Sequence, residues 1–254
     1  MEVHHHPNVE KKNFKEYFLE FLMIFLAVTM GFFAENIRES ISKHEQEHQL
    51  MSEMVEDLKR DTADIHLHIQ ITKQKIYSFD TLIDLVFQSR RGKLSESALR
   101  KMYYLYTQSK GWGPHEPTTR TLNQLEKENG FGFIHKMEIS DSILTYKDLN
   151  QLSITLSERF RSRQEQAREF AQNIFDSEFL SKDYFFRLNE DSLSNQKVKL
   201  KILTQDNNIL NIYGAKLIDA RIVLRTYLIR LEIKDQCATR LAKNINQQYN
   251  LNAE

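Results

Sequence analysis

The sequence is poor in the residues that break helices or cross-link a fold. Its 254 residues include 7 glycines, 3 prolines and 1 cysteine, Cys237. Strand-rich folds need many tight turns that glycine and proline supply, so this scarcity predicts long helices joined by few corners. A single cysteine excludes a disulfide within the chain, and a helix-rich domain of this size does not need one even outside the cytoplasm.

The sequence also lacks an excess of either charge and a recognisable set of catalytic residues. Lys and Arg total 35, as do Asp and Glu, and no long basic stripe is present, so nucleic acid is not an expected partner. There is no glycine-rich phosphate loop, nucleophile elbow or C-x-x-C pair. We therefore expect a protein that is not an enzyme and that carries no cofactor.

What the sequence does contain is one long apolar run, from Tyr17 to Ala34, interrupted only by Glu20 and Thr29. As a helix the run measures about 27 Å, at the short end of what spans a bilayer core. A cleaved signal peptide is the alternative, but Phe32 stands where a small residue should precede cleavage after Ala34. We therefore predict a single transmembrane helix.

The flanking charges predict how this helix is oriented. Lys11, Lys12 and Lys15 precede the run, whereas Glu35, Arg38 and Glu39 nearly cancel after it. Because positive residues stay on the cytoplasmic side, the N-terminus should be cytoplasmic. We expect a cytoplasmic tail (1–16), a single-pass anchor in the cell inner membrane (17–34) and a periplasmic helical bundle (35–254).

One face of the anchor is a candidate surface for self-association. Helical spacing places Glu20, Ile24, Ala27, Gly31 and Ala34 on this face, and Ala27 with Gly31 forms the small-xxx-small pattern that lets helices approach closely in lipid. Glu20 lies one turn inside Tyr17, where nearby lysines can neutralise it. It has either an interfacial or packing role, or a role in a proton, ion or partner contact.

The region after the anchor predicts one continuous helix. No glycine or proline occurs between Glu35 and Gln88, and apolar positions recur at alternating steps of four and three, as in a coiled coil or helical bundle. We call these positions the seam: Met51, Val55, Leu58, Thr62, Ile65, Ile69, Thr72, Ile76, Phe79, Ile83 and Val86. A second apolar flank predicts packing against more than one neighbour; it comprises Leu67, Ile71, Leu82 and Leu85.

Further along the chain the pattern predicts two short and two long helices. The short helices cover Ser95–Gln108 and Thr119–Asn129, and we expect both to cap the membrane-distal end of the bundle. The long helices cover Ile139–Ile174 and Leu203–Tyr249, and Asp176–Asn195 should wrap the bundle as a loop and short helix. The fold class is therefore all-α, with the anchor continuous with a long-helix extracytoplasmic bundle or coiled coil.

The break Lys110–Pro117 has the composition of an ordered or binding loop. It holds two of the three prolines, two glycines and the only tryptophan. Because such loops often carry contacts, we predict that Trp112, His115 and Glu116 bind a partner. A ligand pair formed by His115 with Glu116 or His135 is the alternative.

The histidines of the first long helix match a catalytic pattern only weakly. His44, Glu45 and His48 fit the zincin sequence H-E-x-x-H, but Glu47 adds a charge where those enzymes have an uncharged residue. His66 and His68 lie about 30 Å further along the helix and could approach only from an antiparallel chain. The adjacent histidines of the N-terminal tail, in Met1–Pro7, have no fixed surroundings. We therefore predict no metal site.

Two segments resemble a known family: the anchor region EYFLEFLMIFLAVTMGFFAENIRE and the later TRTLNQLEKENGFGFIHKMEISDSILTYKDL. The resemblance is to an uncharacterised family of single-span membrane proteins common in Bacteroidota, and it covers about a third of the chain. It rests on the anchor, the T-L-x-Q-L motif, Gly130, Ile134, Ile143 and Tyr146. It implies a cell-envelope location and no particular reaction.

Together these features predict a non-enzymatic, membrane-anchored interaction or scaffold protein of the cell envelope. Its expected partners are the lipid bilayer, further copies of itself through the anchor and seam, and another envelope protein. An ion- or proton-coupled accessory subunit that uses Glu20 is one alternative. A sensor-like, ligand-binding helical bundle is another alternative. A sensor needs a cytoplasmic output domain, and we expect the 16 residues before the anchor to be too few to form one.

Overall fold

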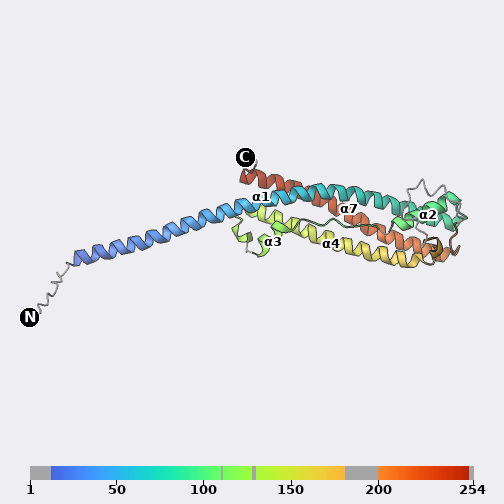
Figure 1. Ribbon diagram of the computed structural model, residues 1–254, viewed down its shortest axis with the longest axis horizontal. Coiled ribbons are helices and arrows are strands. Elements are labelled where there is room, and N and C mark those ends of the chain that lie inside the picture. The colour runs from blue at the N-terminus through green and yellow to red at the C-terminus, as the bar shows by residue number, and fades with distance from the viewer. Residues whose placement is uncertain (1–12, 110, 128–129, 181–199, 252–254) are drawn as a thin grey trace, which may run out of the picture. The chain divides into compact units, whose positions relative to one another are not determined.

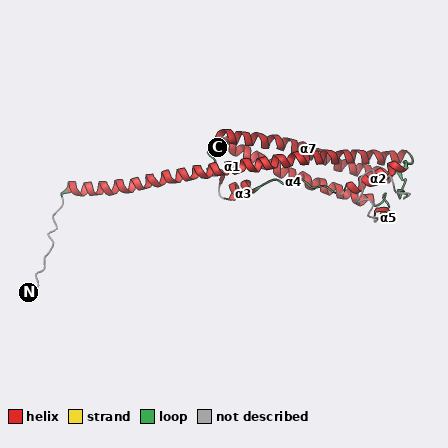
Figure 2. Cartoon of the chain, turned by 45° about the horizontal axis from the view of Figure 1, so that its top comes forward, coloured by secondary structure: helices red, strands yellow, loops and turns green. Residues whose placement is uncertain are grey.

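In the part of the chain that its computed structural model describes, residues 13–109, 111–127, 130–180 and 200–251, the regular secondary structure is helical. Within these residues the one departure is an isolated antiparallel bridge between Phe175 and Ile202, and Figure 2 shows the helices in red. The predicted all-α class is therefore confirmed. The chain divides into two compact units, Met1–Leu50 and Met51–Glu254.

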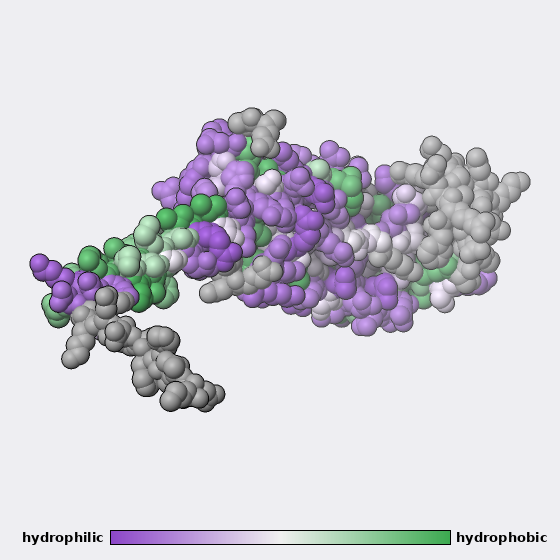
Figure 3. Space-filling view, turned by 60° about the vertical axis from the view of Figure 1, so that its left-hand side comes forward, coloured by the Kyte–Doolittle hydropathy of each residue, from purple (hydrophilic) through white to green (hydrophobic). Residues whose placement is uncertain are grey.

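The first helix, α1, runs from Phe14 to Arg91 without interruption, as the absence of proline and glycine after Gly31 predicts. Among the described residues it is the helix that is long and apolar enough to cross a membrane. The side chains of its apolar part are exposed, and Figure 3 shows this hydrophobic surface in green. The first unit therefore contains a candidate membrane span near the N-terminus.

The second unit is a bundle of three long helices: the later part of α1, α4 (Met137–Ala171) and α7 (Asn207–Tyr249). α7 begins at Asp206, whose carboxylate accepts a hydrogen bond from the Asn208 amide at 2.7 Å. It runs antiparallel to α1, since side chains of α1 bond to it at Asp235 early and at Asn211 late. Figure 1 shows the three helices side by side.

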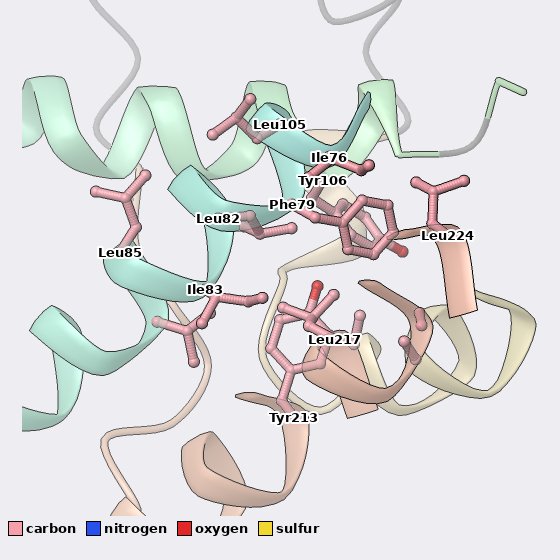
Figure 4. Close-up of a cluster of buried hydrophobic side chains, with 14 of the residues drawn as sticks. Ile76, Phe79, Leu82, Ile83, Leu85, Leu105, Tyr106, Tyr213, Leu217 and Leu224 are labelled. Carbon is pink, nitrogen blue, oxygen red and sulfur yellow. The ribbon is translucent and has the colours of Figure 1, made fainter. Parts of the chain in front are cut away.

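The seam forms the inner face of α1 in this bundle. Met51, Ile65 and Val86 are fully buried, as heptad spacing predicts. Aliphatic and aromatic side chains of α1, α2 and α7 meet in one cluster (Figure 4). Its labelled members are Ile76, Phe79, Leu82, Ile83, Leu85, Leu105, Tyr106, Tyr213, Leu217 and Leu224.

The second apolar flank is only partly confirmed. Leu82 and Leu85 are buried in the cluster that also contains residues of α2, but Leu67 and Ile71 are exposed by 53% and 38%. The difference arises because α2 covers only the last turns of α1. The spacing of apolar residues in the sequence cannot indicate how far along α1 a second neighbouring helix extends.

The predicted position of the short helices is wrong for one of them. α2 (Glu96–Gln108) begins at the predicted cap Ser95, whose hydroxyl accepts from the Ala98 amide at 3.2 Å, and it lies where α1 ends. α3 (Arg120–Lys127) lies at the other end of the bundle, where Thr121 bonds to Asp57 (Figure 1). The two helices are separated because the segment between them is extended along the bundle.

The remaining elements are short. A 3-10 helix, η1 (Gly130–Phe133), follows α3, and α5 (Ser177–Leu180) follows α4. α4 ends a few residues before the end of the predicted helix Ile139–Ile174. α7 begins a few residues after the start of the predicted helix Leu203–Tyr249. Most of the predicted wrapping segment, from residue 181 to Asn195, lies outside the described residues.

Candidate functional site

Residues 111–119 join α2 to α3 as an extended segment, which we call the strap. All three long helices bond to it or to Gln108 and Ser109, which come just before it. From α1, Lys75 donates to the carbonyls of Gln108 and Gly111 at 2.6 and 2.8 Å. From α4, the side-chain amide of Gln164 donates to the Ser109 carbonyl. From α7, the Tyr227 hydroxyl accepts from the His115 amide at 2.9 Å.

The predicted partner loop lies within this strap, and two of its three residues turn inward. Trp112 is half-buried, with its ring edge-on to Phe160 at 4.8 Å and to Tyr227 at 5.2 Å between centroids. His115 is only 3% exposed, whereas Glu116 is exposed. The segment is therefore ordered, and Glu116 alone of the three is placed to contact a partner directly.

His115 belongs to a buried polar cluster, which comprises Asp61, Asp64, His115, Tyr146 and Lys234. Lys234 is fully buried, and its ammonium group donates to His115 Nδ1 at 3.0 Å. The proton of the neutral imidazole must then be on Nε2, which faces the Asp64 carboxylate at 3.8 Å. The cluster thus links a half-exposed carboxylate to a buried cation through one histidine.

Asp61 connects this cluster to the strap. It is 2% exposed and accepts hydrogen bonds from the Thr118 amide at 2.7 Å and from the Tyr146 hydroxyl. Four residues earlier, Asp57 accepts from the amide and hydroxyl of Thr121 at 3.1 and 2.6 Å. Because the spacing of four residues is one helical turn, both carboxylates lie on the same side of α1, where Asp61 fixes the end of the strap and Asp57 the first turn of α3.

Burial sets the protonation of the cluster. Burial, and after it the charge of Lys234, lowers the pKa of His115 to about 3, against the opposing effect of Asp64. Burial also lowers the pKa of Lys234 to about 8, against the attraction of Asp61 and Asp64. At neutral pH His115 is therefore uncharged and Lys234 is mainly protonated.

The sequence-based reasoning missed Asp57, Asp61, Asp64 and Lys234. A pattern was present, because the three aspartates are spaced by four and three residues, the spacing of the seam beside them. Charged residues at this spacing are usually solvated, so the pattern alone does not mark a buried site.

The other predicted site residues lie on α1. Glu20, Ala27, Gly31 and Ala34 are exposed on the apolar part of the helix. His44 and His48 are also exposed and lie one turn apart. Elsewhere in the described residues, His66 bonds to Asp235 at 3.0 Å, the His68 ring lies 5.6 Å from the His115 ring, and His135 is exposed.

Within the described residues of one chain, no group of three or more His, Cys, Asp or Glu side chains could hold a metal ion. No protein-family model, curated protein or solved structure matches the sequence. The geometry of the chain itself is therefore the basis for any functional proposal.

Replacing Tyr227 by phenylalanine tests how firmly the strap is held. The change leaves the buried His115 amide without its acceptor but keeps the ring against Trp112. An unpaired buried donor costs about 1–3 kcal/mol, so we expect the free energy of unfolding to fall by that amount. Urea titration of the full chain in detergent measures it. Tyr77→Phe is the control, because Tyr77 is 69% exposed on α1; equal effects of the two changes would contradict the prediction.

Proposed function

We propose that this chain is a non-enzymatic, membrane-anchored interaction or scaffold protein of the cell envelope that self-associates through α1. The observation that carries the proposal is that the heptad register of the seam extends back along α1 to the residues before Met51. Counted back from the seam, its first (a) positions are apolar or small through the predicted anchor, except at Glu20 and His48. They are Glu20, Ala27, Ala34, Ile41, His48, Val55, Thr62, Ile69, Ile76 and Ile83.

The same register is apolar and exposed just beyond the anchor. Ile37 and Ile41 occupy its fourth (d) and first positions and are 61% and 55% exposed. The charged residues of these turns lie at other positions and pair along the helix, Glu35 with Arg38 and Glu39 with Lys43. An apolar stripe between charged flanks is the surface that a second parallel helix covers in a coiled coil.

The proposed location is the cell inner membrane, with the N-terminus in the cytoplasm and the bundle in the periplasm. Three lysines before the span support this orientation, because positive residues are retained on the cytoplasmic side. The resemblance to single-span envelope proteins is consistent with it. Accessibility of Cys237 to a membrane-impermeant thiol reagent in intact cells, after permeabilising the outer membrane, tests the orientation.

A sensor-like, ligand-binding bundle is the second candidate function. The buried polar cluster favours it, since Lys234 is a fully buried cation of the kind that can bind an anionic ligand. However, its ammonium group is already matched by Asp61 and Asp64, and the strap covers it. The scaffold proposal therefore accounts for the cluster more simply, as the device that fixes the strap.

Gly31→Leu tests self-association through the anchor. The added bulk forces two closely packed helices apart, so we expect the oligomer to be lost from detergent and from native membranes. Crosslinking in membranes and light scattering in detergent measure this. Thr29→Leu is the matched control, because residue 29 lies on the opposite face of the helix from Ala27 and Gly31.

Glu20→Gln separates the scaffold from an ion-coupled subunit. The change keeps size and hydrogen bonding but removes the titratable charge, so a packing residue tolerates it and a proton carrier does not. We expect the oligomer to persist or tighten. If Glu20→Gln abolished assembly while Gly31→Leu had no effect, the wrong face of the anchor would have been assigned.

A further inference from the structure

The two histidines of the H-E-x-x-H pattern occupy inner positions of the same heptad register. His44 is at a fourth (d) position and His48 at the next first (a) position, directly after Ile37 and Ile41. The His44 side chain is 74% exposed in the single chain. A coiled-coil sequence places polar residues at such positions at a cost in stability, so histidines at two successive positions call for a specific explanation.

In a parallel pair of helices each inner position meets the same position of the second copy. The pair would therefore bring together four imidazoles, two at position 44 and two at position 48, in layers about 6 Å apart along the axis. One chain supplies only two of the four ligands. This is consistent with the absence of a three-ligand group within the described residues of one chain.

We infer that two copies of this chain bind one divalent transition-metal ion, of the class represented by Zn²⁺, between His44 and His48 of each copy. Four neutral imidazoles provide the tetrahedral nitrogen ligands that zinc accepts. The inference rests on the proposed self-association and adds a ligand to that same interface. It also assigns the histidines to assembly instead of catalysis.

The surroundings of His44 favour this assignment. The Glu47 carboxylate lies 3.8 Å from His44 Nδ1, on the same turn of α1. A carboxylate beside one ring nitrogen favours a proton there and leaves Nε2 as the metal ligand. Glu45 flanks the two layers and adds negative charge near a divalent cation, which strengthens binding.

Metal binding at a shared site must strengthen the assembly, because the ion binds the pair and not the single chain. We expect Zn²⁺ to lower the dissociation constant of the dimer at least tenfold.

The experiment uses the full chain in detergent micelles, with His4, His5 and His6 replaced by glutamine in every sample to remove competing imidazoles. Dimer dissociation is measured by energy transfer between labelled chains, after chelation and again with added Zn²⁺, and bound zinc is counted per chain. We expect one zinc per two chains. His44→Gln and His48→Gln should each abolish the zinc effect and leave the metal-free dimer, and His66→Gln, which lies outside the seam, should change neither.

The outcomes separate the two proposals. A metal-free dimer whose stability does not change with Zn²⁺, or a zinc effect that survives in both His44→Gln and His48→Gln, would overturn the metal site and leave self-association intact. A chain that stays monomeric at every concentration, with and without Zn²⁺, would overturn self-association itself.

Discussion

Asp61→Ala is expected to lower the free energy of unfolding of the bundle by about 3–5 kcal/mol, the cost of leaving a buried charge without its compensating charge. Asp61 is 2% exposed and opposes the burial of the Lys234 charge. Its removal also leaves the Thr118 amide and the Tyr146 hydroxyl without their acceptor. Asp64 can compensate only in part, because its side chain is half-exposed to solvent.

The double variant Asp61→Ala, Lys234→Met identifies which part of this loss is electrostatic. Methionine fills much of the space of the lysine stem but carries no charge. With Lys234 replaced, the loss of Asp61 no longer leaves a buried positive charge without a compensating negative charge. We expect the double variant to lose less free energy of unfolding than the two single variants lose together, by about 1–3 kcal/mol. The loss that remains reports the unpaired Thr118 amide and Tyr146 hydroxyl.

Urea titration of the full chain in detergent, followed by circular dichroism, gives all four free energies. Glu56→Ala is the matched control, because Glu56 is an exposed carboxylate on the same stretch of α1, and its loss should cost less than about 0.5 kcal/mol. An effect of Asp61→Ala as small as that of Glu56→Ala would show that the cluster does not hold the bundle together. Strict additivity in the double variant would show that Asp61 and Lys234 do not interact.

The long helices could be predicted because their information is local. The seam repeats within each few residues, and Met51, Ile65 and Val86 are buried where its period places them. The cap at Ser95 is likewise fixed by its own neighbours. The spacing of apolar residues cannot specify the position of a segment that has no regular apolar spacing. For this reason the strap, and with it the position of α3, was not predicted.

The buried polar cluster was missed for a related reason. Asp61 meets Thr118 and Tyr146, which lie 57 and 85 residues away in the chain, and His115 meets Lys234 at a separation of 119 residues. Each residue alone has the character of a solvated polar side chain. Only the three-dimensional arrangement of strap, α1, α4 and α7 shows that their charges and hydrogen bonds match. Composition indicated that 110–117 is special, but not that its Trp112 and His115 face inward.

Mild acid is expected to destabilise the bundle through His115. Its pKa in the folded chain is about 3, below the usual 6.5, so between these values the unfolded chain binds a proton that the folded chain does not. Stability due to the neutral imidazole is therefore complete above pH 6.5 and is lost as the pH falls towards 3. Each unit of pKa difference corresponds to about 1.4 kcal/mol, so the loss from this group reaches roughly 4–5 kcal/mol at most.

The groups that face His115 explain the sign of this effect. On α7, Lys234 donates to its Nδ1 and would be repelled by an imidazolium. On α1, His68 also disfavours the charge, whereas Asp64, half-exposed at 3.8 Å, favours it. Protonation therefore breaks the bond to Lys234 at the point where the strap enters the bundle.

His115→Gln removes the titrating group while keeping a polar side chain beneath the strap. We expect this variant to be less stable than the parent at pH 7 but to lose less stability between pH 6.5 and pH 4. The free energy of unfolding is measured by urea titration at each pH, and the two slopes are compared. His135→Gln, at an exposed position, should follow the parent throughout. If His115→Gln and the parent declined in parallel, the acid sensitivity of the bundle would lie in its carboxylates and not in His115.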